Sequence, residues 1–535
     1  MAKRLRVLPA GLDCLLVELG DLETAMSLFD CLLAAPLHGV MEMVPAARTV
    51  MVRFDPLVTD RTRIVEELAR IDLSVHNARK GELYEIPVAY DGEDLDDVAK
   101  LLGWTVEEVI RRHTAATFTV AFTGFAPGFA YMTCDDPGFD VPRRNSPRTH
   151  VPAGSVAIAG QFGGIYPSDS PGGWQILGRT PVKMWDTARD KPALLAPGDR
   201  VQFRNMAEGA RAPVFAARKQ EARALSPTQG LRVTRCDRPA LYQDRGRPGR
   251  ADQGVAESGA LDRHSLAEAN LCVGNPRDAA ALEIVFGGFS LRTDRPVTLA
   301  VTGAPCPLTI HTHDGGMVAA PFAKPFALDA GDELSLGIPP EGARSYLALR
   351  GGFVVEPVLG SAATDTLAKV GPALVQTGDV LVPADRPACA VDPCRPQPLP
   401  LPRAGEMVTL DIALGPRTDW FTDQGIETLL SQEWLVTAES SRVGMRLSGN
   451  ETLERRDHAE LPSEGTPNGA IQVPHSGQPV LFLADHPVTG GYPVIGVVAR
   501  HHLDLAGQMP IGARIRFNPI AGFDPQEIEQ RNPAR

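Results

Sequence analysis

Apolar residues in the first part of the chain follow two kinds of spacing. Runs with few polar interruptions, LDCLLVEL and RTVMVRFD (residues 12–19 and 48–55), are typical of buried strands. By contrast, LETAMSLFDCLLAA and TDRTRIVEELARI (residues 22–35 and 59–71) place their apolar residues on one face of a helix. This alternation of strand and helix predicts a small α/β lobe of ferredoxin-like type over residues 1–82.

From residue 83 the pattern becomes β-rich. A strand-like run, YEIPVAY, precedes two short helices, the second of which opens at Thr105 with Glu108 at capping-box spacing. Beyond these helices, short apolar runs alternate with Gly and Pro, which is the signature of a β-barrel or sandwich. We therefore assign residues 83–205 to a second domain and the small, polar stretch 206–228 to an interdomain linker.

The remainder, residues 229–525, is again β-rich and repeats landmarks of the preceding domain. GGWQILG and GGYPVIG, which begin at Gly172 and Gly490, share a Gly-Gly-aromatic start, an aliphatic pair and a final Gly. Each follows a similar run, GSVAIAG or GAIQVPHSG, and each precedes a terminal strand, GDRVQF or GARIRF. A third strand of this kind, GDELSLG, indicates another barrel, so we expect a double barrel in the second half.

Length and composition restrict the function classes. The 535 residues suffice for several domains, and the net charge of −12 argues against a nucleic-acid surface, which needs clustered Lys and Arg. The 8 cysteines form no CxxC pair and read as reduced thiols. We find no signal-peptide pattern and no run of the roughly 18 to 20 apolar residues that a membrane helix needs. We expect a cytoplasmic protein that binds neither nucleic acid nor membrane, with homo-oligomerisation left open.

Three clusters of polar residues beside Gly and Pro turns carry candidate chemistry. The first, residues 125–181, is rich in arginine, whose planar fork suits carboxylate or phosphate. The second, residues 242–288, surrounds a helix, and the third, residues 438–493, combines carboxylates with serines and an arginine. The bland alternatives, which are turns, helix caps and solvated charge, are the commoner uses of such residues.

The histidine pairs do not predict a metal site. His311 and His313 would share one face of a strand, with no third ligand in sight. His501 and His502 would point to opposite faces if their stretch is extended. The chain also has neither a GxxxxGK[ST] phosphate loop nor a GxSxG nucleophile elbow, so any ATP site is not a P-loop and an ordinary α/β-hydrolase is disfavoured.

Taken in order, the three clusters resemble two protein families joined end to end. FTGFAPGFAYM, PRRNSPRTHVPAGSVAIAG and IYPSDSPGGWQILGRTP resemble the B subunit of 5-oxoprolinase, whose family is also called kinase A inhibitor or allophanate hydrolase subunit 1. SGALDRHSLAEANLCVGNP, GAIQVPHSGQP and TGGYPVIGVV resemble the C subunit, in the biotin-dependent carboxyltransferase-like, or allophanate hydrolase subunit 2, family. The resemblance covers nearly the whole chain.

The resemblance implies a mainly β fold with α+β elements, in which the small ferredoxin-like lobe precedes tandem cyclophilin-like β-barrels. It implies the B/C component of an ATP-dependent 5-oxoprolinase-type hydrolase, which activates a cyclic amide by phosphorylation and opens the ring with a separate partner similar to the 5-oxoprolinase A subunit. The implied cofactor is ATP with Mg²⁺. Covalently attached biotin is not expected, because the chain has no Ala-Met-Lys-Met-like tetrapeptide.

Two alternatives remain. The same domain pair forms the carboxyltransferase part of urea carboxylase, and that role would require carboxybiotin from another chain. A histidine-kinase inhibitor, which one family name implies, would bind a kinase without turnover of ATP. Regulation of this kind needs only the first half of the chain.

Under the resemblance, polar residues of the motifs become candidates for the site. For catalysis, meaning proton handling or metal-phosphate contact, we expect Asp262, Arg442, Glu464 and Asp485. For substrate or nucleotide binding we expect Gly128, Tyr131, Arg143, Arg148, His150, Lys183, Gln472 and Tyr492. The chain departs from the family pattern, with loss of polar reach toward a pocket, at Ala362, Ala363, Ser441, Pro487 and Val488, which leaves the substrate open as 5-oxoproline, urea or another amide.

Overall fold

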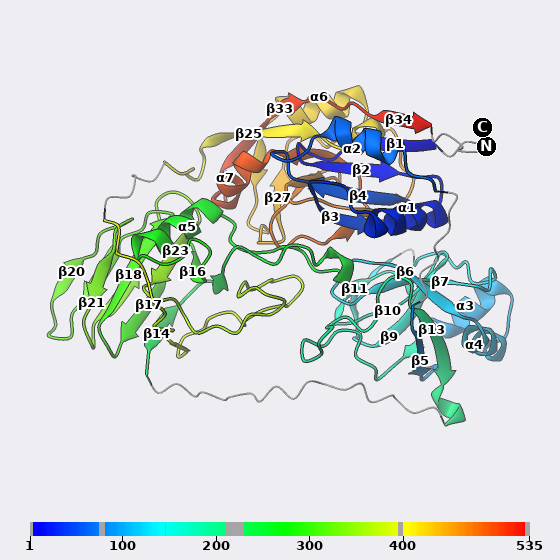
Figure 1. The fold of residues 1–535 in the computed structure, drawn as a ribbon, viewed down its shortest axis with the longest axis horizontal. Helices are drawn as coiled ribbons and strands as arrows, with labels where there is room; N and C mark the ends of the chain where they lie inside the picture. Colours follow the sequence, from blue (N-terminus) through cyan, green and yellow to red (C-terminus); the bar gives the residue numbers. More distant parts are fainter. Residues whose placement is uncertain (1–3, 74–80, 145, 210–228, 394–399, 530–535) are drawn as a thin grey trace.

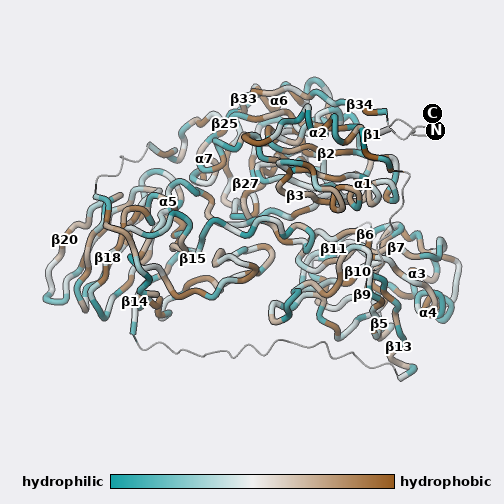
Figure 2. Tube along the Cα trace, in the orientation of Figure 1, coloured by the Kyte–Doolittle hydropathy of each residue, from teal (hydrophilic) through white to brown (hydrophobic). Residues whose placement is uncertain are grey.

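The computed structural model describes residues 4–73, 81–144, 146–209, 229–393 and 400–529. These residues form an N-terminal lobe, a first barrel, a middle unit of two sheets and a second barrel (Figure 1). Each part has its own apolar core, and the apolar segments follow the strands (Figure 2). The two barrels confirm the prediction of a mainly β fold with tandem barrels.

The N-terminal lobe, residues 4–73, is a five-stranded antiparallel sheet with two helices. Asp21 and Asp60 cap these helices, since their carboxylates accept from the backbone N–H groups of Thr24 and Arg63 at 2.7 and 3.0 Å. The sequence pattern identified β2 and β4 but not β1 and β3, with which they form hairpins. The elements are β1 (Arg4–Pro9), β2 (Cys14–Glu18), α1 (Leu22–Ala34), β3 (Val40–Pro45), β4 (Thr49–Phe54) and α2 (Arg61–Leu68), and β34 (Gln526–Glu529) completes the sheet beside β1.

The first barrel, residues 83–205, is a seven-stranded sheet that curls until its two edges meet at the bridge between Ala89 and Arg179. The predicted cap of the second helix is present, because Thr105 Oγ1 accepts from Glu108 N at 3.2 Å. In sheet order the strands are β12 (Gln175–Arg179), β9 (Ser155–Ala159), β10 (Phe162–Ile165), β7 (Ala130–Cys134), β6 (Phe118–Thr123), β13 (Arg200–Asn205) and β5 (Leu83–Val88). The other elements are α3 (Leu95–Leu102), α4 (Val106–Ala115), η1 (Met206–Glu208) and a two-stranded flap, β8 (Arg148–Val151) with β11 (Ser170–Gly172).

The second barrel, residues 407–521, is closed and also has seven strands. In sheet order they are β32 (Val494–Val498), β29 (Ala470–Gln472), β30 (Val480–Phe482), β27 (Gly444–Ser448), β26 (Trp434–Val436), β33 (Arg514–Ala521) and β25 (Met407–Leu414). The other elements are η3 (Thr418–Trp420), α6 (Asp423–Ser431), η4 (Arg500–His502), α7 (Leu503–Gly507) and a flap, β28 (Glu464–Gly465) with β31 (Thr489–Gly490).

The two barrels have the same strand order and the same flap. In each, the terminal strand is inserted between the first strand, to which it is parallel, and the second, to which it is antiparallel. These terminal strands, β13 and β33, begin within GDRVQF and GARIRF, the landmarks matched in the sequence. The topology therefore confirms the internal repeat.

The middle unit, residues 230–392, consists of two sheets whose facing side chains share one core. The elements of the middle unit are β14 (Leu231–Cys236), β15 (Ala240–Gln243), η2 (Ala251–Gln253), α5 (Arg263–Cys272), β16 (Ala281–Val285), β17 (Phe289–Thr293), β18 (Val297–Gly303), β19 (Leu308–His311), β20 (Met317–Ala319), β21 (Phe326–Leu328), β22 (Glu333–Leu336), β23 (Arg344–Leu349) and β24 (Val380–Leu381). The run GDELSLG provides β22, which lies in an open six-stranded sheet. Most of the predicted linker, residues 210–228, lies outside the described residues.

Long segments of the middle unit extend to the centre of the molecule, where the other parts meet (Figure 1). Thr123 Oγ1 in the first barrel donates to Asp252 O at 2.5 Å, and Gly128 N donates to Gln253 O at 3.0 Å. The sheet face of the lobe that carries Leu16 packs in one cluster with Ala251 and with Val488 of the second barrel. The sites discussed below lie between these parts.

Candidate functional site

A buried arginine joins the second barrel to the middle unit. Arg442, in the turn before β27, donates to both oxygens of Asp485, with Nε to Oδ2 at 2.9 Å and Nη2 to Oδ1 at 3.0 Å. From the middle unit, Glu283 Oε1 and Gly259 O accept from the same guanidinium at 2.6 and 2.7 Å. Asp485 lies in the segment after β30 of the second barrel, and Glu283 lies in β16 of the middle unit. The charges of two domains therefore meet at one side chain.

The pairing fixes the charge states of this group. Burial alone would lower the pKa of Arg442, but the attraction of Asp485 and Glu283 raises it above its ordinary value. Burial likewise would raise the pKa of Asp485, and Arg442 holds it below the ordinary range. A buried ion pair of this kind is costly to break, because a single remaining charge would be stranded away from water.

Hydrogen bonds extend this charge network to Asp262. Tyr346 OH donates to Glu283 Oε2 at 2.7 Å and accepts from Asp262 N at 2.8 Å. The Asp262 carboxylate caps α5 through Ser265 N at 2.8 Å and accepts from Gln508 Nε2 at 2.8 Å, and burial raises its pKa. Three of the four predicted catalytic residues, Asp262, Arg442 and Asp485, are therefore linked in one network.

Sequence reasoning missed a further acid beside this network. Asp485 Oδ2 accepts from both N and Oγ1 of Thr366, at 2.9 and 2.8 Å, and the preceding residue is the buried Asp365. Asp365 Oδ1 accepts from two backbone N–H groups, whereas Oδ2 has no partner among the described residues. Burial, and then the charge of Asp485, raise the pKa of Asp365 to about 7. The sequence did offer a signal for this residue, because Asp365 is the only acid in the LGSAATD segment.

A cavity of about 350 Å³, here called the central cavity, lies against the network between the middle unit and the second barrel. Most of its wall is apolar, with Leu374, Met445 and Met509 among the lining residues. Its polar lining comes from Arg238, Arg344, Arg442, Thr366, Ser440 and Ser441. The Arg344 guanidinium is buried beside the carboxylate of Glu283, with Nε 3.6 Å from Glu283 Oε1, and its Nη1 donates to Gly507 O.

The backbone of the cavity wall is strained at Phe286. This residue has φ of 53°, in the left-handed region that bulky side chains rarely adopt. Its neighbour Gly287 also has positive φ, and a Cβ there would lie 1.9 Å from Gly337 O. Arg238 Nη1 donates to Phe286 O at 2.8 Å and so holds the turn. Strain of this kind is commonly retained where it shapes a functional site.

The fourth predicted catalytic residue, Glu464, belongs to a different ion pair. Arg417 Nε donates to its two oxygens at 2.8 and 3.1 Å, and Arg417 Nη1 also reaches Glu18 Oε1 of the lobe at 2.7 Å. Burial raises the pKa of Glu464, while Glu464 and Glu18 raise that of Arg417 against the effect of burial. This group connects the flap of the second barrel to the lobe.

The stretch FTGFAPGFAYM lies at the joint between the two barrels. Tyr131 is buried in an aromatic cluster with Phe122, Phe129 and Trp174, and burial raises its pKa. Thr489, on the flap of the second barrel, bonds to the backbone N–H of Phe125 at 3.1 Å. Tyr131 and its neighbours thus form a packed interface. Gly128, with φ of 76°, makes the turn that this packing needs.

Of the remaining candidates of the first barrel, Arg148 and His150 lie on its flap, Arg143 precedes the flap, and Lys183 follows β12. Arg148 donates to Asp94 at 2.8 and 2.9 Å and to Glu93 at 3.0 Å, so its fork is already occupied. Burial would raise the pKa of Asp94, and Arg148 lowers it below its ordinary value. The others are exposed or half-exposed: Arg143 pairs with Glu460 at 3.1 Å, His150 pairs with Asp169 at 3.4 Å, and Lys183 is at the surface.

Gln472 and Tyr492 are adjacent in the second barrel. Gln472 is buried in β29, and its Nε2 donates to Tyr492 O at 3.1 Å. The ring of Tyr492 is 39% exposed and meets His475 edge to face at a centroid distance of 5.3 Å. Neither residue is hydrogen-bonded to the network around Arg442. The candidate residues of the sequence clusters therefore lie at several separate places in the structure.

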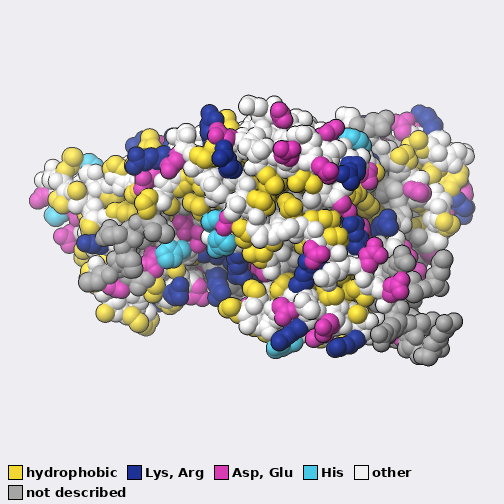
Figure 3. Space-filling model, turned by 90° about the horizontal axis from the view of Figure 1, so that it is seen from above, with side chains coloured by type: hydrophobic (Ala, Val, Ile, Leu, Met, Phe, Trp, Pro, Cys, Tyr) yellow, Lys and Arg dark blue, Asp and Glu magenta, His cyan; other side chains and the backbone are white. Residues whose placement is uncertain are grey.

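A second, larger cleft of about 920 Å³ lies between the first barrel and the middle unit. Its lining from the first barrel includes Lys191, and its lining from the middle unit includes Arg250 and Asp252. The turn at Leu359–Gly360, where both residues have positive φ, presents backbone on the same wall. On the face of the molecule drawn in Figure 3, charges of both signs are interspersed.

Comparison with known proteins supports this division of the chain. The family model for carboxyltransferase domain, subdomain C and D, matches residues 5–195, and the model for subdomain A and B matches residues 253–519. Among the described helices, none is long and apolar enough to cross a membrane.

Relatives match each part separately. The chain is 34% identical to the 5-oxoprolinase C subunit of Escherichia coli (strain K12) over 291 residues, which are 54% of this chain and 90% of that protein. It is 37% identical to the 5-oxoprolinase B subunit of Bacillus subtilis (strain 168) over 190 residues, 32% of this chain and 78% of that protein. Urea amidolyase of Saccharomyces cerevisiae is 32% identical over 52% of this chain, but only 16% of that protein is covered.

One solved structure resembles the chain over nearly its full length. The crystal structure of TTHA0988 is 33% identical with a TM-score of 0.78, and the match covers 94% of this chain and 99% of that one. The overall fold of the chain is therefore shared with a solved structure along nearly the whole length of both chains. The chain belongs to the carboxyltransferase-domain family, as a fusion of parts homologous to the B and C subunits of 5-oxoprolinase.

Proposed function

We propose that the chain is the B/C component of an ATP-dependent 5-oxoprolinase-type lactamase, which opens a cyclic amide to an amino acid together with a separate A-subunit-like protein. The observation that carries this proposal is the central cavity, whose volume of about 350 Å³ falls within the usual range for small-molecule sites. Its apolar wall suits the methylene groups of a lactam ring. Its arginines and hydroxyls suit a carboxylate and an amide.

Several polar groups of the cavity have a role in this proposal. Arg344, which lies beside Glu283, and Arg442, which is held rigid by Asp485 and Glu283, offer positive charge to the substrate carboxylate. The hydroxyls of Thr366 and Ser441 are within the lining and suit the lactam group. Asp365, which is next to Thr366 and titrates near neutral pH, suits proton transfer to the opening ring through water.

For ATP, the flap of the first barrel fits poorly, because the Arg148 fork is taken by Asp94 and Glu93. The larger cleft fits better: Lys191 and Arg250 suit phosphate oxygens, and Asp252 suits Mg²⁺. The chain's own residues would bind and orient ATP there. This cleft and the central cavity share no lining residue, so transfer of the phosphoryl group to the lactam oxygen requires that the two bound molecules be brought together in the complex with the A-subunit-like protein.

The proposal is tested by mixing the purified chain with its cognate A-subunit-like protein, ATP, Mg²⁺ and 5-oxoproline. We expect ADP and glutamate in equal amounts, neither of which the separate proteins release. The same assay is repeated with a panel of other lactams, in case the substrate is not 5-oxoproline. A different substrate is plausible because Ala362 and Ala363, where the chain departs from the family pattern, lie in the segment that leads to Thr366 of the cavity wall. Absence of lactam-stimulated ATP hydrolysis across the panel would contradict the proposal.

A second candidate, a carboxyltransferase fed with carboxybiotin by another chain, is favoured by the similarity to urea amidolyase. The two functions differ in their product. In the same assay, carboxybiotin and urea or another amide replace ATP and lactam, and transfer of labelled carboxylate to the amide would support the second candidate. A histidine-kinase inhibitor would give neither product.

A further inference from the structure

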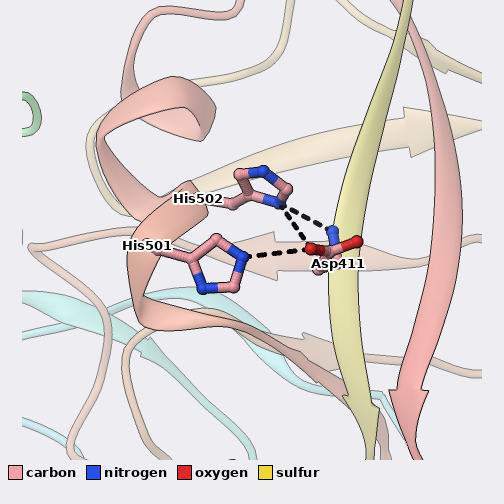
Figure 4. Close-up of side chains that lie close together, drawn as sticks. All are labelled: Asp411, His501 and His502. Atoms are coloured by element: carbon pink, nitrogen blue, oxygen red, sulfur yellow. Dashed lines mark hydrogen bonds and ion pairs between the residues drawn. The ribbon is translucent and has the colours of Figure 1, made fainter.

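Two histidines and a carboxylate meet on the second barrel, outside the cavities described above. Asp411 lies in β25, and His501 and His502 lie in η4, directly after the neighbouring strand β32. The sequence placed the two rings on opposite faces only if this stretch were extended, whereas the stretch forms a 3₁₀ turn. Both rings approach the same carboxylate (Figure 4).

The spacing of the three side chains suits a tetrahedral ion. Asp411 Oδ2 lies 3.0 Å from His501 Nε2 and 3.8 Å from His502 Nδ1, and the three ligand atoms lie within 4.8 Å of one another. Zinc bonds to nitrogen and oxygen are about 2.0–2.1 Å, so a tetrahedral ion separates its ligand atoms by roughly 3.3 Å. The two distances from Oδ2 bracket this value, and small side-chain rotations would equalise them.

Hydrogen bonds hold the three side chains in place. Asp411 N donates to His502 Nδ1 at 2.8 Å, so this nitrogen carries no proton and its lone pair points at the backbone N–H of Asp411. Asn518 Nδ2 donates to Asp411 Oδ1 at 2.7 Å and thereby orients Oδ2 toward the histidines.

We propose that Asp411, His501 and His502 bind a divalent transition-metal ion, with Zn²⁺ as the best match to two imidazoles and one carboxylate. Binding replaces the proton that His501 Nε2 shares with Asp411. It also replaces the backbone hydrogen bond to His502 Nδ1, whose lone pair turns to the ion. The fourth position of the ion stays open to water.

The ion would hold a wall of the central cavity. η4 continues directly into α7, and the segment from His502 onward contains Ala506 and Met509, which line that cavity. An ion bound by His501, His502 and Asp411 would therefore connect this segment to β25. The expected consequence of metal binding is a more stable second barrel, through preferential binding to the folded state.

The test is a calorimetric titration of the tag-free, chelator-treated full-length chain with Zn²⁺ at pH 7.5. We expect saturable binding of one ion per chain and a rise in the melting temperature. Asp411→Asn and His501→Ala should each weaken binding at least about tenfold. His264→Ala, which removes an exposed histidine outside the cluster, should bind as the unaltered chain does.

A second readout separates ligation from folding. Bound Co²⁺ absorbs visible light strongly in a tetrahedral site, and Asp411→Asn should lose this absorption while it keeps the far-ultraviolet circular dichroism of the folded chain. Lack of one-to-one binding by the unaltered chain would overturn the proposal. Equal binding by Asp411→Asn and the unaltered chain would overturn it too. None of these readouts depends on lactamase activity.

Discussion

Asp94 and Arg417 occupy the same place in the two barrels but carry opposite charges. The N–H of Asp94 donates to Ile176 O at 3.2 Å and that of Arg417 donates to Val494 O at 3.0 Å, at matching positions of β12 and β32. Each side chain then pairs with its own flap: Asp94 with Arg148, and Arg417 with Glu464. The acid and the base have exchanged places, so a buried ion pair fastens the flap in each copy of the fold.

We expect Arg417→Met to lower the free energy of unfolding by about 3–5 kcal/mol, because it leaves Glu464 buried without its partner. The matched control is Arg446→Met, at an exposed arginine of the same barrel, which should change it by no more than about 0.5 kcal/mol. Urea unfolding followed by the second barrel's tryptophan fluorescence measures both. Similar values for the two variants would show that the ion pair does not fasten the flap.

Gly124 should be unable to accept even a methyl group. A Cβ there would lie 2.3 Å from Thr489 Oγ1, so Gly124→Ala should push the two barrels apart and cost roughly 1–3 kcal/mol. Thr489→Ala removes the clashing atoms. In a double-mutant cycle, the double variant should therefore be more stable than the two single effects predict. If the effects of the two substitutions on the free energy of unfolding simply add, the clash between Gly124→Ala and Thr489 is not the cause of the destabilisation.

The pH dependence of stability should reveal Asp365. Its pKa is about 7 in the folded chain and has its ordinary value near 3.8 in the unfolded chain, so the folded state binds this proton more tightly. The stabilisation is complete below pH 3.8 and is lost as the pH rises toward 7. The amide in Asp365→Asn does not titrate, so this variant stays neutral over the whole range.

The melting temperature of Asp365→Asn should therefore rise relative to that of the unaltered chain between pH 5 and pH 8. Asp278→Asn, which changes an exposed aspartate, provides the baseline. A constant difference across this range would mean that Asp365 does not titrate there. Thermal scans at matched ionic strength suffice for the comparison.

Arg442→Lys keeps a positive charge but cannot hold both oxygens of Asp485 in a planar fork. In the assay with the A-subunit-like protein, we expect lactam-dependent ATP hydrolysis to fall at least about tenfold. Arg232→Lys, at an exposed arginine of β14, should keep full activity. Full activity of Arg442→Lys would show that the charge network does not support the site.

The barrels and their duplication were readable from the sequence because Gly-Gly-aromatic landmarks and terminal strands recur at similar spacing. Asp262, Arg442 and Asp485 were identified as polar residues of motifs, but their connection through Glu283 and Tyr346 spans two domains. No local pattern encodes such long-range contacts. Asp365 was overlooked because its burial, and not its neighbours in sequence, sets its chemistry.

The role of Tyr131 in substrate or nucleotide binding stays a prediction. Its ring packs with other aromatic residues of the first barrel and with Ala46 and Ala47 of the N-terminal lobe. A local pattern reports an interrupted strand, but it does not tell whether another domain covers it. For His501 and His502 the assumed backbone was decisive, since a 3₁₀ turn in place of an extended strand brings both rings to Asp411.

If the lactam binds in the central cavity, replacement of a leucine by the larger tryptophan should abolish activity at one position of a loop and not at another. Leu374 and Leu367 are each 42% exposed, but only Leu374 is among the residues that line the cavity. Leu374→Trp should fill the cavity and abolish lactam-dependent ATP hydrolysis with the A-subunit-like protein, while Leu367→Trp keeps it. Equal activity of the two folded variants would contradict binding of the lactam in this cavity.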